Sequence, residues 1–449
     1  MGLPRLCSKW MLLAMLATEA GSCIAAAADW PTWRGPFGTG VSIETNAPLK
    51  WSRTQNVRWR TVLPEPGNST PIVWGDTVYL TQAIGNKRTV MALDRRTGKV
   101  RWTYGAESKV PERTQRMNPA CAPSPVTDGE RIIAWFGTAG LVSFDKSGKG
   151  QWRTDLGRQN HQFGYASSPV LHGNRVYLNF GPGDREFVIA VDKRSGKVLW
   201  QITAPTPGAD DTYGTWSTPT VAQVDGRFQL IVALRDHLAG YDLESGTNLW
   251  FSRGLGLQAK SSPIAADGVA LISGDLRGAE LAVRLGGTGD VTDSHRLWRE
   301  VPPRSRIGTG IARDGHIYGV QANGILDCVS LQTGDIVWAE RQPGAGANSA
   351  IWSSPILVGN LLYVINQGGD TVTYRASTNF QSVAVNSLGE PCNASLALAY
   401  GDFFIRTWNA LWCIRGSPAE TASATASTNH SGATANPTNA RPGATTRAK

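Results

Sequence analysis

Apolar and polar residues alternate in short runs along most of the chain, and glycine-containing turns separate the runs. The stretch 72–80 is representative, because the apolar triplet Ile72-Val73-Trp74 is followed by a Gly-Asp turn and a second run, Thr77-Val78-Tyr79-Leu80. Short runs rich in β-branched and aromatic residues, bounded by such turns, are typical of β-strands. The pattern therefore predicts an all-β protein.

Tryptophan recurs at a nearly constant interval. It stands at Trp102, Trp152, Trp200, Trp250, Trp298 and Trp338, with successive gaps of 50, 48, 50, 48 and 40 residues. Self-similarity at a period of this length indicates a repeat architecture, in which each repeat is one supersecondary unit.

Most of these tryptophans follow the same phrase, Asp-x-x-Thr/Ser-Gly. The segments from Asp to Trp are 94–102, 145–152, 192–200 and 242–250, and 331–338 carries a weaker version without the aspartate. In such a turn the side chain of aspartate can accept backbone N–H groups, and glycine can take a positive φ. Each phrase therefore predicts a hairpin whose second strand ends in tryptophan.

A second phrase, Ser-Ser/Thr-Pro or Ser-Pro, opens each unit. It reads Ser69-Thr70-Pro71, Ser124-Pro125, Ser167-Ser168-Pro169, Ser217-Thr218-Pro219, Ser261-Ser262-Pro263 and Ser353-Ser354-Pro355. An apolar strand, a Gly-Asp or Gly-Asn turn and a second strand follow this phrase. Together with the hairpin described above, each unit holds four short strands, which is the composition of a propeller blade. A linear β-solenoid is the alternative, but its coils are usually much shorter than these repeats, so the propeller is favoured.

The two ends of the repeat region each hold an incomplete unit. Complete units end near the six tryptophans and, in degenerate form, near Asn386, whereas Ala394 to Arg415 supplies strands without a closing tryptophan. Val57-Arg58-Trp59-Arg60 near the start is a lone closing strand. Pairing the two ends completes an eighth blade and removes exposed sheet edges. We therefore predict an eight-bladed β-propeller over 57–416.

The first residues have the features of an export signal. Arg5 and Lys9 precede an apolar run from Trp10 to Ala17, and small residues follow near 25–28. The run is shorter than the roughly 20 residues of a membrane-spanning helix. We interpret 1–28 as a signal peptide and expect a periplasmic or extracellular protein. Lipidation at Cys23 is the alternative, and it is disfavoured because leucine is missing three residues before the cysteine.

Three further features limit the class of protein. The tail, 417–449, is rich in Ser, Thr, Ala, Asn and Pro and is predicted to be disordered. The net charge is +9, but no run of Lys or Arg resembles a nucleic-acid footprint. Cys121 and Cys328 are expected in strands of different blades as buried thiols. Cys392 and Cys413 are expected in the first and third strands of the last blade, too far apart for a disulfide.

The phrase Asp-x-x-Thr/Ser-Gly-Lys-x-x-Trp resembles the repeat of PQQ-like (quinoprotein-type) propellers. That group includes bacterial quinoprotein alcohol dehydrogenases and the propeller lipoprotein of the outer-membrane protein assembly machinery. The segment Asp29 to Ser42 resembles the start of exported PQQ-like repeat proteins of planctomycete-type bacteria. We expect residues 29–56 to form a lead-in that packs on the propeller through two tryptophans and an arginine, rather than a ligand site.

The resemblance also implies which groups would hold the quinone in a quinone-dependent enzyme. The quinone would be expected to stack between a tryptophan and a disulfide of adjacent cysteines, beside a calcium ion and an aspartate base. No adjacent cysteines occur after residue 28, and no cluster of calcium ligands is visible. PQQ is therefore not expected as a cofactor, and no metal site is predicted.

No catalytic motif stands out, because the histidines are scattered and no metal-binding, phosphate-loop or nucleophile spacing appears. The links between blades cross one face of a propeller and form its central funnel. The candidate ligand-binding residues on these links are Arg116, His161, Tyr165, Asp211, Trp216, Lys260, Arg306 and Trp352. This set suits a polar small molecule, a glycan or an extended peptide. The favoured interpretation is an exported, non-catalytic binding or scaffolding propeller; the alternatives are a PQQ-dependent dehydrogenase and a polysaccharide-acting enzyme.

Overall fold

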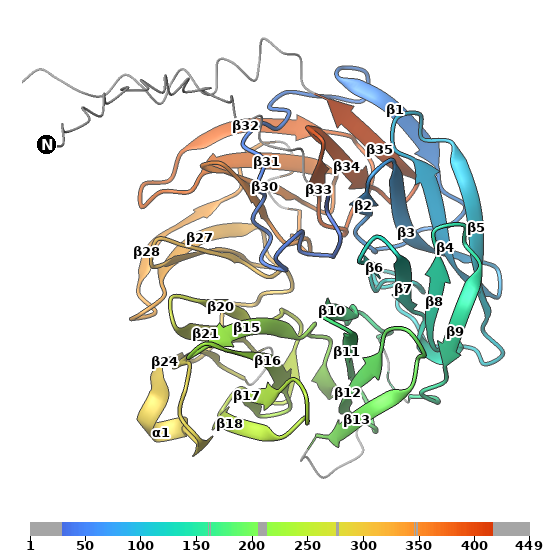
Figure 1. The fold of residues 1–449 in the computed structure, drawn as a ribbon. Coiled ribbons are helices and arrows are strands. Elements are labelled where there is room, and N and C mark those ends of the chain that lie inside the picture. The colour runs from blue at the N-terminus through green and yellow to red at the C-terminus, as the bar shows by residue number, and fades with distance from the viewer. Residues whose placement is uncertain are drawn as a thin grey trace, which may run out of the picture.

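The computed structural model describes residues 29–159, 161, 163–204, 213–274, 278–344, 346 and 349–415. Within these residues the strands form eight four-stranded antiparallel sheets around a central axis, one of them extended by a fifth short strand (Figure 1). The fold is an eight-bladed β-propeller, as the repeats predict. The predicted signal peptide and the predicted tail lie outside the described residues.

The first half of the described chain forms blades 1 to 4. Blade 1 consists of β2 (Ile72–Trp74), β3 (Thr77–Ile84), β4 (Lys87–Asp94) and β5 (Val100–Glu107). Blade 2 consists of β6 (Val126–Thr127), β7 (Arg131–Trp135), β8 (Leu141–Asp145) and β9 (Gly150–Thr154). Blade 3 consists of β10 (Val170–His172), β11 (Arg175–Phe180), β12 (Phe187–Asp192) and β13 (Val198–Thr203). Blade 4 consists of β15 (Thr220–Val224), β16 (Arg227–Leu234), β17 (His237–Asp242), β18 (Asn248–Arg253) and the added β23 (Gly289–Asp290).

The second half forms blades 5 to 8. Blade 5 consists of β20 (Ile264–Ala266), β21 (Val269–Ser273), β22 (Glu280–Arg284) and β24 (Arg296–Glu300), preceded by the short helix α1 (Thr292–His295). Blade 6 consists of β25 (Ile311–Arg313), β26 (His316–Val320), β27 (Ile325–Ser330) and β28 (Ile336–Arg341). Blade 7 consists of β29 (Ile356–Val358), β30 (Leu361–Ile365), β31 (Asp370–Arg375) and β32 (Ser382–Ser387). Blade 8 consists of β33 (Ala397–Ala399), β34 (Asp402–Arg406), β35 (Ala410–Arg415) and β1 (Val57–Val62). A 3-10 turn, Gly137–Ala139, lies in blade 2, and a small parallel pair, β14 (Gly214–Thr215) with β19 (Gln258–Ala259), joins two links.

The repeated tryptophan joins each blade to the next. In six blades the indole Nε1 donates a hydrogen bond of 2.9–3.1 Å to a backbone carbonyl in the last turn of the following blade. The pairs are Trp59 with Arg95, Trp102 with Lys146, Trp152 with Lys193, Trp200 with Leu243, Trp298 with Leu331 and Trp338 with Ser377. The turn glycine leaves room for the ring: a Cβ on Gly98 would lie 2.5 Å from Trp59. The spacing from Asp to Trp therefore encodes contacts between blades.

Trp250 is the exception among the repeated tryptophans. Its Nε1 donates to Gln229 of its own blade, and the indole is fully buried. The reason is local, because β23 pairs in parallel with β18 and covers the outer edge of blade 4.

The Ser-Ser/Thr-Pro phrase forms a closed ring of hydrogen bonds around the central channel. In each blade the N–H of one Ser or Thr donates to the hydroxyl of the equivalent residue in the next blade, over 2.8–3.1 Å. The hydroxyl ring consists of Thr70, Ser124, Ser168, Thr218, Ser262, Thr309, Ser354 and Ser395. Thr309 and Ser395 lack the following proline, so the phrase did not reveal them.

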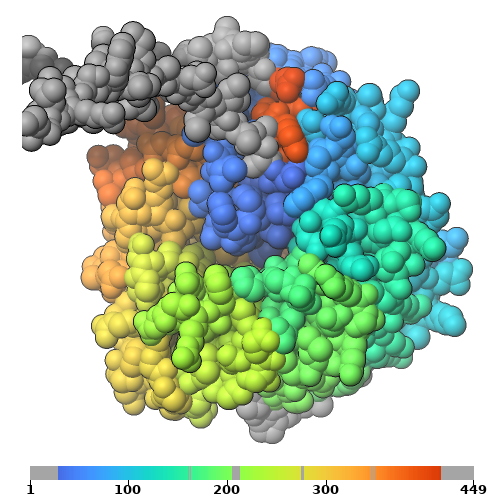
Figure 2. Space-filling view, in the orientation of Figure 1, coloured from blue at the N-terminus to red at the C-terminus, as the bar shows by residue number. Residues whose placement is uncertain are grey.

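The lead-in lies across one end of the channel. Trp30 pairs with Val73 of β2, Val41 pairs with Leu357 of β29, and Trp30 is buried. In Figure 2 the blue atoms of this segment occupy the centre of the visible face, bordered by the green atoms of blades 3 and 4. Arg34 reaches from the lead-in to the backbone carbonyls of Pro355 and Gly310. The lead-in thus contacts the propeller through the buried Trp30 and Arg34, whereas Trp33, the second tryptophan named in the sequence analysis, is half-buried.

The two ends of the repeat region close the ring as predicted. β1 pairs antiparallel with β35, so that Trp59 lies opposite Cys413 and Thr61 opposite Leu411. Ion pairs reinforce the joint, because Arg58 and Arg415 both bind the buried carboxylate of Asp402, at 2.8 and 2.7 Å.

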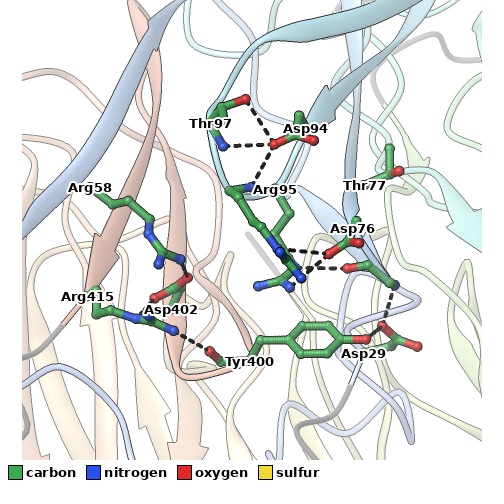
Figure 3. A network of polar contacts seen from close by, with 12 residues as sticks. Asp29, Arg58, Asp76, Thr77, Asp94, Arg95, Thr97, Tyr400, Asp402 and Arg415 are labelled. Atoms are coloured by element: carbon green, nitrogen blue, oxygen red, sulfur yellow. Dashed lines mark hydrogen bonds and ion pairs between the residues drawn. The ribbon is translucent and has the colours of Figure 1, made fainter.

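Blade 1 is fastened to blade 8 by a second group of contacts, shown with these ion pairs in Figure 3. The guanidinium of Arg95 lies 4.0 Å from the ring centroid of Tyr400, and the hydroxyl of Tyr400 lies 2.8 Å from Asp29 (Figure 3). Asp29 also accepts from the N–H of Gly75. These contacts and the Arg58–Asp402–Arg415 group together hold the closing blade in place.

The four cysteines after residue 28 are buried and unbonded, so the predicted absence of a Cys392–Cys413 disulfide is confirmed. Two placements were wrong. Cys121 and Cys392 lie in links before β6 and β33 rather than in strands. Cys121 takes φ +62°, a conformation that a regular strand would not allow.

Candidate functional site

The two faces of the propeller differ in what builds them. The links from the outer strand of one blade to the inner strand of the next lie on one face, here called the link face. The turns after each inner strand lie on the opposite face, here called the turn face, where Asp29 and Glu44 of the lead-in bind Gly75, Tyr400 and Gly401. The sequence-predicted site residues that the structure describes belong to the link face.

The link between blades 1 and 2 forms a turn that other blades hold in place. The N–H of Asn118 donates to the carbonyl of Gln115, and Arg116 is exposed at the tip. Asn68 and Asn393, which precede blades 1 and 8, both donate to the carbonyl of Met117, at 2.8 and 3.0 Å. Asn118 in turn donates to the carbonyls of Phe163 and Tyr165. This anchored turn, 115–118, therefore spans the entrances of blades 8, 1 and 3.

Three of the candidate residues lie together under this turn. His161 and Tyr165 are in edge-to-face contact with ring centroids 4.5 Å apart, and both are buried. Nδ1 of His161 accepts from the N–H of Gly164, which makes Nε2 the protonated nitrogen if the ring is neutral. The indole of Trp216 donates to the carbonyl of Gly164 at 2.9 Å. These aromatic side chains hold the second link in shape, and little of their surface faces solvent.

A small cavity touches His161 and Tyr165 but has room only for water. Its volume is about 10 Å³, and it is also lined by Glu112, Arg113 and Thr138. Glu112 accepts from the N–H of Thr138 at 2.7 Å and pairs with Arg88 at 3.3 Å. Burial, together with the negative charge of Glu112, raises the pKa of Tyr165. Tyr165 is therefore neutral near pH 7.

Arg306 forms part of a buried network of ion pairs. Its Nε lies 3.0 Å from Glu280 and its Nη1 lies 2.9 Å from Asp327, and Glu280 also binds Arg304 at 2.8 Å. Burial alone would lower the pKa of Arg306, but the two carboxylates outweigh it and raise that pKa above its usual value. The guanidinium has no free approach for a ligand, so its contribution in this structure is to join blades 5 and 6.

The other candidates are spread around the same face. The parallel pairing of β14 with β19 sets Trp216 and Lys260 at equivalent positions of neighbouring links, and Lys260 is half-buried. Trp352, before blade 7, is also half-buried. Asp211 lies outside the described residues. The structure thus groups His161, Tyr165 and Trp216, places Lys260 next to Trp216, and leaves Arg116, Arg306 and Trp352 in separate blades.

Two buried charged groups on the link face were missed by the sequence reasoning. Arg406, at the end of β34, donates to Ser69, to the carbonyl of Thr81 and to Gln82, and burial lowers its pKa to about 10. Glu186 accepts from the N–H of Thr215 at 2.9 Å, and burial raises its pKa although Arg235 opposes the rise. No repeat phrase marks either residue, and only the folded topology brings their partners near.

Within the part of the chain that the structure describes, no three His, Cys, Asp or Glu side chains come close enough to hold a metal ion. Among the same residues, no helix has the length and apolar composition that a membrane span requires.

Comparison with solved structures supports the architecture. BamB from Moraxella catarrhalis superposes with a TM-score of 0.57 over 80% of this chain and 99% of that one, at 12% identity. A quinohemoprotein alcohol dehydrogenase from Comamonas testosteroni superposes with a TM-score of 0.51, covering 87% and 81% of the two chains, also at 12% identity. At these identities the likeness concerns the fold alone.

Sequence comparison reaches proteins of both kinds. The outer membrane protein assembly factor BamB of Yersinia pestis is 25% identical over 260 residues, 54% of this chain and 61% of that protein. A polyvinylalcohol dehydrogenase from a Pseudomonas species is 26% identical over 225 residues, 43% of this chain and 34% of that enzyme. The matched regions thus span about a third to three fifths of these relatives.

The family model described as outer membrane protein assembly factor BamB matches three overlapping segments, 49–180, 82–268 and 184–415. Together they cover all eight blades, from the strand that closes the ring to the last strand of blade 8. The chain belongs to this family of PQQ-like repeat propellers.

Proposed function

We propose that this protein is an exported, non-catalytic binding or scaffolding propeller that recognises a polar ligand, a glycan or an extended peptide on its link face. The observation that carries the proposal is the anchored turn, 115–118. Asn68 and Asn393 hold the backbone of the turn through two hydrogen bonds to one of its carbonyls, and the side chain of Asn118 ties the turn to the next link through two more. Gln115 and Arg116 remain exposed. A fixed turn that presents polar side chains loses little conformational entropy on binding.

The use of the buried polar groups supports binding over catalysis. The His161 ring, the indole of Trp216 and the guanidinium of Arg306 are each occupied by hydrogen bonds that hold links or blades together. A general acid or base must instead be able to reach a proton on the substrate. The cavity beside His161 holds about 10 Å³, too little for any substrate.

The residues present do not fit a bound quinone. Of the two tryptophans among the candidate site residues, Trp216 is buried and packs against Phe163 with ring centroids 6.0 Å apart, and Trp352 is half-buried. The cysteines nearest the link face, Cys121 and Cys392, are separate buried thiols. We therefore place the dehydrogenase alternative second, and the polysaccharide-acting enzyme third because no paired carboxylates face an open cavity in the described residues.

A binding screen tests the proposal. Purified protein would be applied to a glycan array and to an array of extended peptides, followed by titration of each hit. Arg116→Ala should weaken a genuine hit at least tenfold. Arg194→Ala is the matched control, because Arg194 is equally exposed but lies on the turn face. Equal loss in both variants, or no hit on either array, would argue against recognition on the link face.

The dehydrogenase alternative has its own experiment. The protein would be mixed with PQQ and calcium and passed through a desalting column. Retained quinone absorbance, with reduction of a dye by alcohols or sugars, would reverse the order of the two functions.

A further inference from the structure

The turn face holds two adjoining cavities between the lead-in and the inner strands of blades 3 to 6. Their volumes are about 310 and 330 Å³, within the range of small-molecule sites. Arg34, Gly38 and Thr309 line both, and the two adjoining cavities are together called the chamber below. This chamber is separate from the link face and from every residue of the proposed binding function.

A buried positive charge lies in the wall of the chamber without a counter-ion. Arg34 is 4% exposed, and its three hydrogen bonds go to the carbonyls of Pro355, Thr39 and Gly310. Among the described residues no carboxylate forms an ion pair with Arg34, its Nε has no hydrogen-bond partner, and its guanidinium carbon lies 5.9 Å from the ring centroid of Trp33. Burial lowers the pKa of Arg34 to about 9, which reflects the cost of an uncompensated cation.

The other polar groups of the cavity of about 310 Å³ are mostly hydrogen-bond donors. Ser168, Thr218, Ser262 and Thr309 belong to the hydroxyl ring and line it. Each hydroxyl oxygen accepts a backbone N–H, and no hydrogen bond within the described residues uses its own O–H. No Asp or Glu lines this cavity, and the one acidic residue that lines the second cavity is the exposed Asp267. Such a lining stabilises a ligand that accepts hydrogen bonds and carries negative charge.

The rim of the cavity is aromatic. Phe37 of the lead-in is 65% exposed and Phe228 of blade 4 is 47% exposed. The ring of His172 lies 4.6 Å from that of Phe228, and Trp33 completes the rim. Large exposed aromatic side chains around a concave site offer flat surfaces to the face of a ring.

From these features we propose that the chamber binds a carboxylate on a six-membered ring, with the carboxylate toward Arg34 and the hydroxyl ring and the ring face against Phe37 and Phe228. An acidic sugar and an aromatic acid share this chemistry. The volume fits one such ring and excludes a folded partner.

Isothermal titration with four probes tests the proposal and separates the two sources. The probes are glucuronate with its neutral counterpart glucose, and benzoate with its neutral counterpart benzyl alcohol. Binding of glucuronate but not benzoate would identify the sugar acid, and the reverse would identify the aromatic acid. In either case the neutral counterpart should bind at least tenfold more weakly. Binding of a neutral probe as tight as its acid, or no binding of either acid at millimolar concentration, would overturn the proposal.

Variants locate the site. Phe37→Ala and Phe228→Ala remove exposed rings and should weaken the acid about tenfold without lowering the melting temperature. Tyr104→Ala is the matched control, because Tyr104 is 52% exposed on the outer strand β5. Arg34→Lys, which keeps the charge, should retain more binding than Arg34→Met. Unchanged affinity in both phenylalanine variants would overturn the proposal even if the Arg34 variants did not fold.

Discussion

Deleting residues 29–61 should destabilise the propeller far more than deleting the tail from Ser417. The deletion removes all but the last residue of β1, so that β35 keeps only β34 as a partner and its outer edge is exposed. It also removes three buried tryptophans, Trp30, Trp51 and Trp59. Removal of a buried tryptophan side chain costs about 3–5 kcal/mol. The sum, roughly 10 kcal/mol, is comparable with the roughly 5–15 kcal/mol that stabilises a whole domain.

Thermal melts followed by circular dichroism would compare four proteins: residues 29–449, the deletion of 29–61, the deletion of 417–449, and a shorter deletion of 29–48. The shorter deletion removes Trp30 and Arg34 but keeps β1, so it separates the lead-in from the closing strand. We expect the tail deletion to melt like the longest protein, the shorter deletion to melt lower, and the deletion of 29–61 to be largely unfolded. If the protein without residues 29–61 melted like the longest one, the closure by β1 would not hold the ring together.

Three further predictions concern the interior. Thr309→Val removes the acceptor for the N–H of Ser262. The unpaired, buried N–H should lower the free energy of unfolding, measured by chemical denaturation, by about 1–3 kcal/mol. Thr309→Ser keeps the hydroxyl and should lower it much less. Arg306→Met leaves Glu280 and Asp327 buried without their shared cation and should cost about 3–5 kcal/mol. Arg313→Met is the control, because Arg313 is only half-buried and lies outside this network. Equal loss of stability in both variants would contradict the network. Burial raises the pKa of the Cys392 thiol to about 12, above its value in the unfolded chain, so its contribution is complete below about pH 8.5 and is lost as pH rises toward 12. Cys392→Ala should therefore flatten the decline of stability between pH 9 and 11, and an unchanged slope would assign that decline to other groups.

The fold could be predicted from the sequence because its determinants repeat. Each Asp-x-x-Thr/Ser-Gly turn makes its own hydrogen bonds, as when Asp94 accepts from Thr97 at 2.9 Å, and each tryptophan docks at a fixed distance from such a turn. The incomplete units at the two ends then had one arrangement that left no open edge. Trp250 departed from the pattern because β23 lies far beyond it in sequence and could not be paired by local reasoning.

The link face was harder to predict because burial there depends on contacts between distant blades. Arg306 has the sequence context of an exposed loop, yet Glu280 and Asp327 from two blades enclose it. Cys121 and Cys392 are predicted in strands, Cys392 by counting strands along the last blade, but the chain has not yet entered the sheet at either position. Arg34 was expected to pack, and nothing in its sequence neighbourhood indicated that it would lack a counter-ion.

The hydroxyl ring has a consequence for how such a molecule can change its size during evolution. Every blade donates one N–H to the next blade and accepts one from the blade before it. If a blade were duplicated or lost, each remaining blade would still have one donor and one acceptor of the same type. The hydrogen-bond pattern of the hydroxyl ring therefore does not depend on the number of blades. Contacts farther from the axis do depend on the angle between neighbouring blades, among them the tryptophans that rest on the turn glycines of five blades. An added blade would narrow the angle at every junction and bring the outer strands, with their tryptophan contacts, closer together.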